Sequence, residues 1–272
     1  MLFDQFLREV APSLGLQWRP FRRRGVERRA KKRLIQIGLS HFEEYLLKVK
    51  IDPEEQNHLL KILKVTISRF FRDQETFGAI GDPILPSLLE EKNEKDLKAW
   101  SIGCASGEEP YSLSILWKER FEKMRPRIHL SILATDIDED LLERAKKGRY
   151  KKSSLREVPA DILRRYFSGD NGFYVLDQAI RGDVTFRRHD IIREEPFPGM
   201  DIVFCRNLAF TYFSKESQTT VLKKISGSLR DKGYLVIGKT ESLPLHYPTL
   251  FTPVFPKEKI YRKFGSPIPS TP

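Results

Sequence analysis

The pattern of hydrophobic and polar positions divides the chain near residue 75. Before this point, apolar residues recur at the spacing of one helix face, as in Phe42, Tyr45 and Leu46. Leu59–Leu63 lies in a glycine-free stretch that opens at Asp52, and the proline and two acids after that aspartate are typical of a helix start. No strand-like alternation occurs before residue 95. Residues 1–75 are therefore predicted to form an all-helical N-terminal domain.

From Leu97 onward, short apolar runs alternate with longer amphipathic stretches. The short runs predict strands over Leu97–Ile102, His129–Thr135, Asp201–Cys205 and Tyr234–Gly238. The longer stretches predict helices over Pro110–Phe121, Glu139–Lys147 and Lys215–Asp231, the last of them stopped by Gly233. Strands that alternate with helices indicate βαβ units and a parallel sheet. We therefore expect an α/β domain in this part of the chain.

Residues 148–184 interrupt the alternation of strands and helices. They hold several glycines and an asparagine, together with short apolar runs at Phe173–Leu176 and Val184–Phe186. This pattern predicts a small antiparallel excursion inserted into the α/β domain. Gly265–Pro272 has no apolar pattern and is expected to be a tail.

Composition narrows the class of protein. Of 272 residues, 40% are hydrophobic and 18 are phenylalanine, which is enough apolar material for a folded core. No apolar run reaches the roughly eighteen residues of a membrane span, and the N-terminus lacks the order of a secretory signal. The two cysteines make no disulfide framework or zinc site, and the five histidines are not spaced as metal ligands. We expect a cytoplasmic protein without a metal site.

The net charge of +11 favours an acidic partner. Much of the excess lies in Arg19–Arg33, where a run of arginines and lysines faces one acid, Glu27. The segment is interpreted either as a solvated helix face or as a nucleic-acid contact. Neither an aromatic ladder nor a helix-turn-helix pattern accompanies the charges, which lowers the case for nucleic acid.

The most informative chemistry lies in Gly103–Ser112. An apolar strand runs into a turn of small residues that ends at Gly107, and a helix opens directly afterwards with Glu108 and Glu109. Such a turn lets a ligand approach the backbone closely, at the strand edge where open α/β sheets bind ligands. The spacing is not that of a dinucleotide site, and two carboxylates would repel a pyrophosphate. They suit a cationic ligand, and S-adenosylmethionine carries a sulfonium and an ammonium group.

Asp136 ends the strand that follows this turn in the sequence. That is where a ribose-binding acid belongs in this topology. An aspartate after a strand is also a common helix N-cap, but Asp138 is better placed for that role because the helix begins just after it.

Several segments resemble the signatures of the CheR-type chemotaxis receptor methyltransferases. In chain order they are Ser68–Asp73, Gly103–Ser112, Ala134–Asp138, Ala145–Tyr150, Phe204–Leu208 and Gly233–Ser242. The matches keep the order of the family from about residue 20 to 264, and an ordered set is far more specific than any single motif.

The resemblance implies a fold and an activity. The fold is an all-helical domain over residues 1–75, then a Rossmann-like methyltransferase domain over 76–264 with a small antiparallel β-subdomain inserted at 150–186, and a tail over 265–272. The implied activity is methyl transfer from S-adenosylmethionine to glutamate side chains of methyl-accepting chemotaxis receptors. The product of the cofactor is then S-adenosylhomocysteine.

The resemblance also bears on the partner. It gives the basic segment Arg19–Arg33 a third interpretation, contact with the acidic cytoplasmic helices of a receptor. Residues 150–186 show no clustered glycine loop that would grip a receptor's C-terminal peptide. We therefore expect a type of enzyme that does not depend on that tether.

Cofactor-binding roles carry over residue by residue. Arg72 resembles the arginine that reaches the cofactor and the active site, Glu109 the acid that meets the amino-acid end of the cofactor, and Asp136 the ribose binder. The remaining matches are Gly103 in the cofactor turn, Thr66 and Ser68 where many members have Asn and Thr, Asp190 and Ile191 beside the adenine, and Arg206 and Asn207 as the pair that ends the fourth strand.

One departure concerns the active-site tyrosine. The family usually reads Arg-Asn-x-x-x-Tyr-Phe, and this chain has one residue more, so that Thr211 stands at the usual spacing and Tyr212 follows. We assign the role to Tyr212. The resulting hypothesis is that Arg72 and Arg206 orient the substrate carboxylate while the Tyr212 hydroxyl lies near the transferred methyl group.

Two alternatives to receptor methylation stay open. The same fold serves methyltransferases with other acceptors, such as RNA or a small carboxylic acid. The extra residue before Tyr212 is also compatible with a non-catalytic module that binds the cofactor.

Overall fold

The computed structural model describes residues 1–63, 68–92, 96–245 and 247–265. The chain forms two compact units, one of residues 1–66 and 208–220, the other of 67–207 and 221–272. None of the helices in the described ranges is long and apolar enough to cross a bilayer.

This division differs from the boundary expected at residue 75. Residues 67–75 belong to the larger unit, where the Phe70 ring packs edge-on against Tyr150. Residues 208–220 belong to the smaller unit because their backbone pairs with the loop after the first helix, with Gln17 N–H on the Tyr212 carbonyl and Ser214 N–H on the Gly15 carbonyl, both at 2.8 Å. Both reassignments depend on contacts between segments far apart in the sequence.

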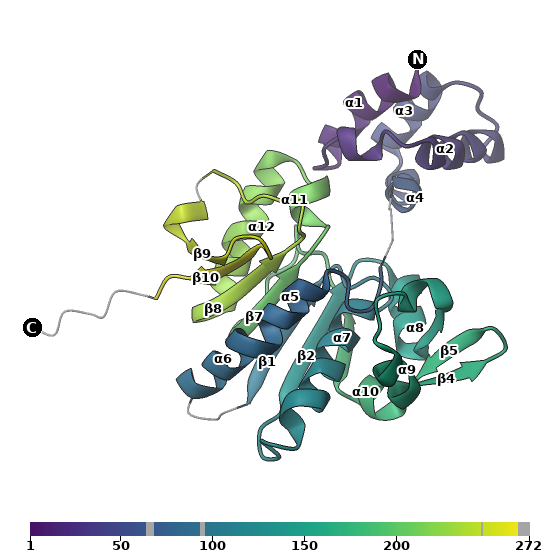
Figure 1. The fold of residues 1–272 in the computed structure, drawn as a ribbon. Helices are drawn as coiled ribbons and strands as arrows, with labels where there is room; N and C mark the ends of the chain where they lie inside the picture. The colour runs from purple at the N-terminus through teal and green to yellow at the C-terminus, as the bar shows by residue number, and fades with distance from the viewer. Residues whose placement is uncertain (64–67, 93–95, 246, 266–272) are drawn as a thin grey trace, which may run out of the picture. The chain divides into compact units, whose positions relative to one another are not determined.

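The smaller unit is helical, as predicted (Figure 1). Its elements are α1 (Phe3–Ser13), η1 (Arg19–Phe21), α2 (Arg24–Gln36), α3 (Phe42–Ile51), α4 (Pro53–Leu63) and the single turn α11 (Ala209–Tyr212). The α4 start follows the sequence signal, since the Asp52 side chain accepts the backbone N–H groups of Glu54 and Glu55 at 3.0 and 3.2 Å.

The core of the smaller unit combines aromatic rings with one buried ion pair. Phe6 stacks on Phe42 and Tyr45, with ring centroids 5.1 and 5.5 Å apart. Next to Tyr45, the buried Glu55 carboxylate accepts two hydrogen bonds from Arg33, at 2.7 and 3.0 Å, and one from the Tyr45 hydroxyl at 2.8 Å. Arg33 therefore fastens α2 to α4 and is not part of the free basic surface.

A mostly parallel sheet forms the centre of the larger unit, as predicted. Its strands are β1 (Leu97–Ile102), β2 (Leu130–Asp136), β6 (Val184–Arg188), β7 (Met200–Cys205), β8 (Leu229–Ile237), β9 (Phe251–Phe255) and β10 (Ile260–Lys263), in the order β6-β2-β1-β7-β8-β10-β9. β6, β2, β1, β7 and β8 are parallel, whereas β10 and β9 are antiparallel additions at one edge. The carboxyl ends of β2, β1 and β7 thus lie side by side.

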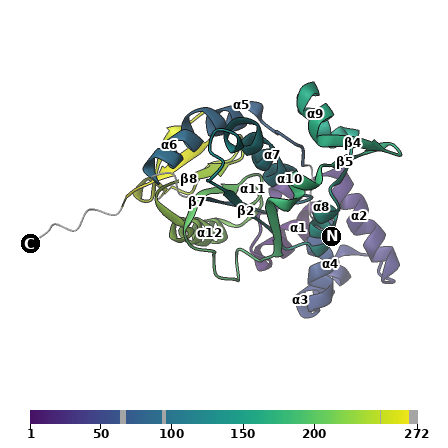
Figure 2. The same ribbon diagram turned by 90° about the horizontal axis from the view of Figure 1, so that it is seen from below.

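Helices pack on both faces of this sheet; α6 and α12 lie on opposite faces in Figure 2. They are α5 (Gln74–Ala79), α6 (Leu85–Glu91), α7 (Glu108–Trp117), α8 (Glu139–Lys147), α10 (Gln178–Gly182) and α12 (Lys215–Ser228). π-helical turns, η2 (Ile80–Ile84) and η3 (Lys118–Glu122), extend α5 and α7, and η5 (Tyr247–Thr249) precedes β9. Division at residue 220 places the first part of α12 in the smaller unit.

The predicted end of α12 was wrong. The helix stops at Ser228 instead of Asp231, and β8 begins at Leu229. Gly233 is not a helix stop but lies inside β8, where a side chain would come within 3.0 Å of the Asp201 carbonyl on the neighbouring strand. The glycine is needed for the close approach of two strands.

The insertion forms a separate antiparallel sheet, β3-β5-β4, with strands β3 (Arg149–Lys151), β4 (Phe167–Asp170) and β5 (Phe173–Leu176). The short helices η4 (Lys152–Leu155) and α9 (Ala160–Tyr166) lie between its strands in the chain. Val184–Phe186 was expected in this excursion, but it belongs to β6 and pairs in parallel with β2 in the main sheet. Short apolar runs alone do not reveal which sheet a strand joins.

Candidate functional site

The turn between β1 and α7 has the tight backbone that the sequence predicts. Gly103 and Gly107 have φ angles of +70° and +88°, and Ala105 between them has +52°. The N–H groups of Gly103 and Cys104 both donate to the Thr135 carbonyl at the end of β2, at 2.8 and 2.9 Å. The turn is thereby fixed across the carboxyl ends of two neighbouring strands.

Gly107 is also sterically required. A Cβ atom at this position would lie 2.9 Å from the Tyr111 ring, 3.0 Å from the Phe186 ring and 3.1 Å from Ala145 Cβ. Close packing around a positive-φ residue leaves glycine as the only residue without strain.

Asp136 lies directly beside this turn. One carboxylate oxygen accepts the Ala105 N–H at 3.0 Å, and the other accepts the Asp138 N–H at 3.0 Å. Asp138 caps α8 by accepting the Asp140 N–H at 3.1 Å, as the sequence indicated. Asp138 therefore caps the helix, whereas Asp136 lies beside the turn between β1 and α7.

Two glutamates occupy the first turn of α7, and both lie in poorly hydrated surroundings. Burial raises the pKa of Glu108, although hydrogen bonds from Ser68 and Ser154 oppose the rise. Burial also raises the pKa of Glu109, and Arg206 is the strongest influence that lowers it again. Glu109 is held at both oxygens, by the Ser101 hydroxyl at 2.8 Å and by Arg206 at 3.3 Å.

Arg206, at the end of β7, is the centre of the site. Besides Glu109, its guanidinium donates to the Asp73 carboxylate at 2.6 Å and to the Arg72 carbonyl at 2.9 Å. Asp73 has a φ angle of +63° and Phe71 one of +50°, so the segment that carries Arg72 is bent sharply to reach Arg206. The family resemblance assigned Arg206 and Arg72 to one site, and the structure brings Arg206 to the backbone carbonyl of Arg72.

The next residue, Asn207, is held in a left-handed conformation with φ +55°. The buried Glu241 carboxylate fixes it by accepting the N–H groups of Asn207 and Gly238, at 2.8 and 2.7 Å. A Cβ atom at Gly238 would lie 2.6 Å from the side-chain nitrogen Nδ2 of Asn207. Glu241 and Asp73 were not predicted as site residues, although both stand in the motifs quoted above.

Asp190 and Ile191 follow β6 at the same edge of the sheet. One Asp190 oxygen accepts the Ile192 N–H at 2.9 Å and the Arg193 N–H at 3.3 Å, and Ile191 is buried. The preceding residue, His189, donates its backbone N–H to the Asp136 carbonyl at 3.0 Å. The loop that bears Asp190 and Ile191 is thus attached to the strand that bears Asp136.

Three predicted residues remain. Thr66 lies outside the described residues, and Ser68 joins the site by hydrogen-bonding the Glu108 carboxyl group. Tyr212 belongs to the smaller unit, where its ring stacks on Phe21 with centroids 5.4 Å apart. The assignment of Tyr212 to the reaction therefore stays a prediction from the motif.

The arrangement suits S-adenosylmethionine on chemical grounds. Carboxylates of Glu109 and Asp136 lie beside the glycine turn, and they suit the ammonium group and the ribose of this ligand. Arg206 Nε is buried and has no hydrogen-bond partner among the described residues, so it is available to a bound group. Burial raises the pKa of the Cys104 thiol well above its ordinary range, which disfavours the reactive thiolate form. The described residues include no cluster of three or more acids, histidines or cysteines that could hold a metal.

Comparison with known proteins identifies the family of this chain. Residues 66–260 match the family described as CheR methyltransferase, SAM binding domain. A chemotaxis protein methyltransferase of Listeria monocytogenes is 31% identical over 88% of this chain and 88% of its own length, and chemotaxis protein methyltransferase 1 of Pseudomonas aeruginosa is 32% identical over 82% and 84%. An uncharacterized 104.1 kDa protein of Rhodobacter capsulatus is 31% identical over 80% of this chain, which spans only 23% of that protein. The chain therefore belongs to the CheR family of S-adenosylmethionine-dependent methyltransferases.

Proposed function

We propose that this protein transfers a methyl group from S-adenosylmethionine to glutamate side chains of methyl-accepting chemotaxis receptors in the cytoplasm, forming glutamyl methyl esters. The observation that carries the proposal is the Arg206 cluster within a CheR-family domain. It places a buried guanidinium, a carbonyl and two carboxylates at the carboxyl edge of the sheet, next to the glycine turn.

The substrate needs little activation by the protein. A glutamate carboxylate is already ionised at neutral pH, since its unperturbed pKa is about 4.3. Bound S-adenosylmethionine supplies a methyl group on a cationic sulfur, and transfer to a carboxylate oxygen yields a neutral ester and neutral S-adenosylhomocysteine. The task of the protein is to align two reactants and to exclude water.

Individual residues would share that task. Arg206 and Arg72 would both contact the cofactor and orient the acceptor carboxylate, because a guanidinium group attracts carboxylates and donates hydrogen bonds to them. Glu109 would hold the amino-acid end of the cofactor, and Asp136 would hold its ribose. Asp190 and Ile191 would lie beside the adenine. The other cofactor-binding residues would be Gly103, Ser68, Thr66 and Asn207. The Tyr212 hydroxyl would lie near the transferred methyl group.

The acceptor side of the proposal concerns α2. Val26, Ala30 and Leu34 are buried on one face of the helix, which leaves Arg28, Lys31 and Lys32 exposed on the other. This exposed cationic face fits the acidic helices of a receptor. Arg33 is excluded from the contact by its pairing with Glu55.

The test is transfer of radiolabelled methyl from S-adenosylmethionine to a membrane fraction of the source cells, followed by mild alkali. We expect label in a receptor-sized band that alkali releases as methanol, because methyl esters are base-labile. Tight binding of S-adenosylhomocysteine without any base-labile label would refute the receptor-methylating activity and favour RNA or a small acid as acceptor.

Single variants test the assigned roles. Arg206→Ala and Tyr212→Phe are each expected to reduce the transfer rate, on the order of tenfold or more. Full transfer rates in both variants would contradict the assignments. Unchanged binding of S-adenosylhomocysteine in Tyr212→Phe would separate an effect on the reaction from an effect on the cofactor.

A further inference from the structure

The segment that bears Arg72 and Asp73 needs external support. Phe71 and Asp73 both have positive φ angles, +50° and +63°, although neither is glycine. Left-handed backbone at such residues persists only where the surroundings hold it. The contacts of this segment with the rest of the larger unit therefore decide whether Asp73 meets Arg206.

Glu157 lies in the loop between η4 and α9 of the insertion and contacts this segment at three points. Its carboxylate pairs with Arg69 at 3.1 Å and accepts the backbone N–H of Asp73 at 3.1 Å. Its own carbonyl accepts the side-chain amide of Gln74 at 2.8 Å. A single residue thus binds the segment before, within and after the strained turn.

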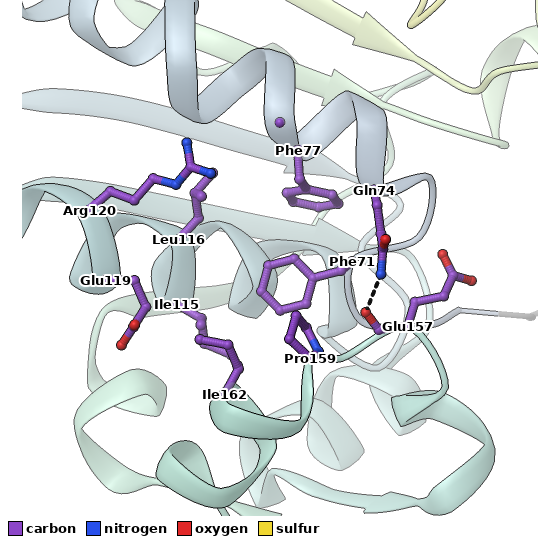
Figure 3. A pocket seen from close by; sticks show the side chains of 11 residues that line it. Phe71, Gln74, Phe77, Ile115, Leu116, Glu119, Arg120, Glu157, Pro159 and Ile162 are labelled. Carbon is purple, nitrogen blue, oxygen red and sulfur yellow. Dashed lines mark hydrogen bonds between the residues drawn. The ribbon is translucent and has the colours of Figure 1, made fainter.

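A pocket lies beside this segment. Glu157, Gln74 and Phe71 line its volume of about 440 Å³, and its other walls come from α5, α7, η3 and α9 (Figure 3). Figure 3 shows the Gln74 amide directed at Glu157 across the edge of this pocket. The Glu157 hydrogen bonds lie at the edge of this pocket. They hold the segment together with the hydrogen bond from the Phe71 N–H to the Ser112 hydroxyl, at 2.8 Å, and the packing of Phe71 against Phe77.

We infer that Glu157 is a positioning residue for the cofactor site, acting through Asp73 on Arg206. The chain of contacts runs from the Glu157 carboxylate to the Asp73 N–H, and from the Asp73 carboxylate to Arg206, which also holds Glu109 at 3.3 Å. The inserted β-subdomain thereby helps to shape the cofactor site. The inference rests on the proposed assignment of Arg206 and Glu109 to the cofactor.

The test compares S-adenosylhomocysteine affinities by isothermal titration calorimetry on the full chain. Glu157→Ala is expected to weaken binding about tenfold, because the Asp73 N–H loses its partner. Glu157→Gln keeps an oxygen that accepts the same N–H and loses only a partly exposed charge pair with Arg69. Its affinity is therefore expected to stay within about threefold of wild type. Rescue by the glutamine distinguishes positioning from a general loss of stability.

A matched control lies in the same insertion. Asp170 pairs with Arg149 at 2.8 Å, away from the Arg69–Gln74 segment, and Asp170→Ala is expected to leave the affinity unchanged. Equal losses in Glu157→Ala and Glu157→Gln, or a loss in Asp170→Ala as large as in Glu157→Ala, would overturn the inference.

Two further variants keep the outcome decisive. Arg206→Ala tests the site assignment itself, and unchanged affinity there would refute that assignment together with the inference. If Arg206→Ala weakens binding and Glu157→Ala does not, only the role of Glu157 fails. Should Glu157→Ala not fold, Gln74→Met removes only the amide donor to the Glu157 carbonyl; we expect a loss of about threefold, and unchanged affinity overturns the inference.

Discussion

Replacement of Arg206 by methionine tests how the site is held together. Methionine keeps much of the length of the side chain but removes the guanidinium. The variant loses three hydrogen-bonded contacts together, those to Glu109, to Asp73 and to the Arg72 carbonyl. Two carboxylates then remain close together in a poorly hydrated place without their shared cation.

The size of the effect follows from burial. The Arg206 side chain is 3% exposed, whereas Asp73 and Glu109 are 24% and 15% exposed. Removing one partner of a buried ion pair costs about 3–5 kcal/mol, because the other charge is left uncompensated. Since water reaches both carboxylates in part, we expect the free energy of unfolding to fall by about 2–4 kcal/mol.

The variant should also gain a pH dependence. Arg206 is the strongest influence that opposes the burial-induced rise in the pKa of Glu109. Without it, Glu109 takes up a proton at higher pH and loses the charge that suits a cationic ligand. Cofactor affinity of Arg206→Met is therefore expected to fall as the pH is lowered, and to do so at a higher pH than in wild type.

Urea denaturation and calorimetric titration with S-adenosylmethionine at several pH values measure both effects. Arg188→Met is the matched control, because Arg188 ends β6 and makes an exposed pair with Glu194, and it should cost no more than about 0.5 kcal/mol. A loss in Arg206→Met no larger than in the control, with unchanged cofactor affinity, would refute the reasoning.

Three other predictions concern the glycine turn, the buried acid and the basic surface. Gly107 has φ +88°, and Tyr111 and Phe186 would lie within 3.0 Å of an added methyl group; Gly107→Ala should therefore lower the free energy of unfolding by about 1–3 kcal/mol and weaken cofactor binding. Gly172→Ala, at φ +78° in open space, is the control for backbone strain alone. Equal cofactor affinities of the two variants would contradict the steric argument. The Arg33 hydrogen bond lowers the pKa of Glu55 below its ordinary value. The stabilisation is therefore present above the ordinary glutamate pKa of about 4.3 and is lost as the pH falls through the lower folded pKa. Acid denaturation should show this loss in wild type and not in Glu55→Gln. Charge reversal of the exposed pair Arg28 and Lys32 should raise the KM for the receptor severalfold at low salt, with little change in cofactor affinity, whereas an unchanged KM would remove α2 from the proposed contact.

The sequence determined the local elements around the site. β1 and α8 have the predicted bounds, because an apolar run and a capped amphipathic stretch are sufficient signals over a few residues. Gly103, Gly107, Glu109 and Asp136 were singled out for the same reason, since each stands at a strand end or a helix start. Arg206 was named from the family resemblance. Asp138 was separated from Asp136 by its place one residue before α8.

Tertiary structure decided which segments meet. β6 joins the main sheet, residues 208–220 join the helical unit, and α12 ends three residues early because β8 pairs with β7. Asp73, Glu157 and Glu241 became visible only through partners 34 to 133 residues away. A periodic pattern reports the environment of each residue along the chain. Long-range hydrogen bonds instead depend on the packing of the whole unit, which no local pattern encodes.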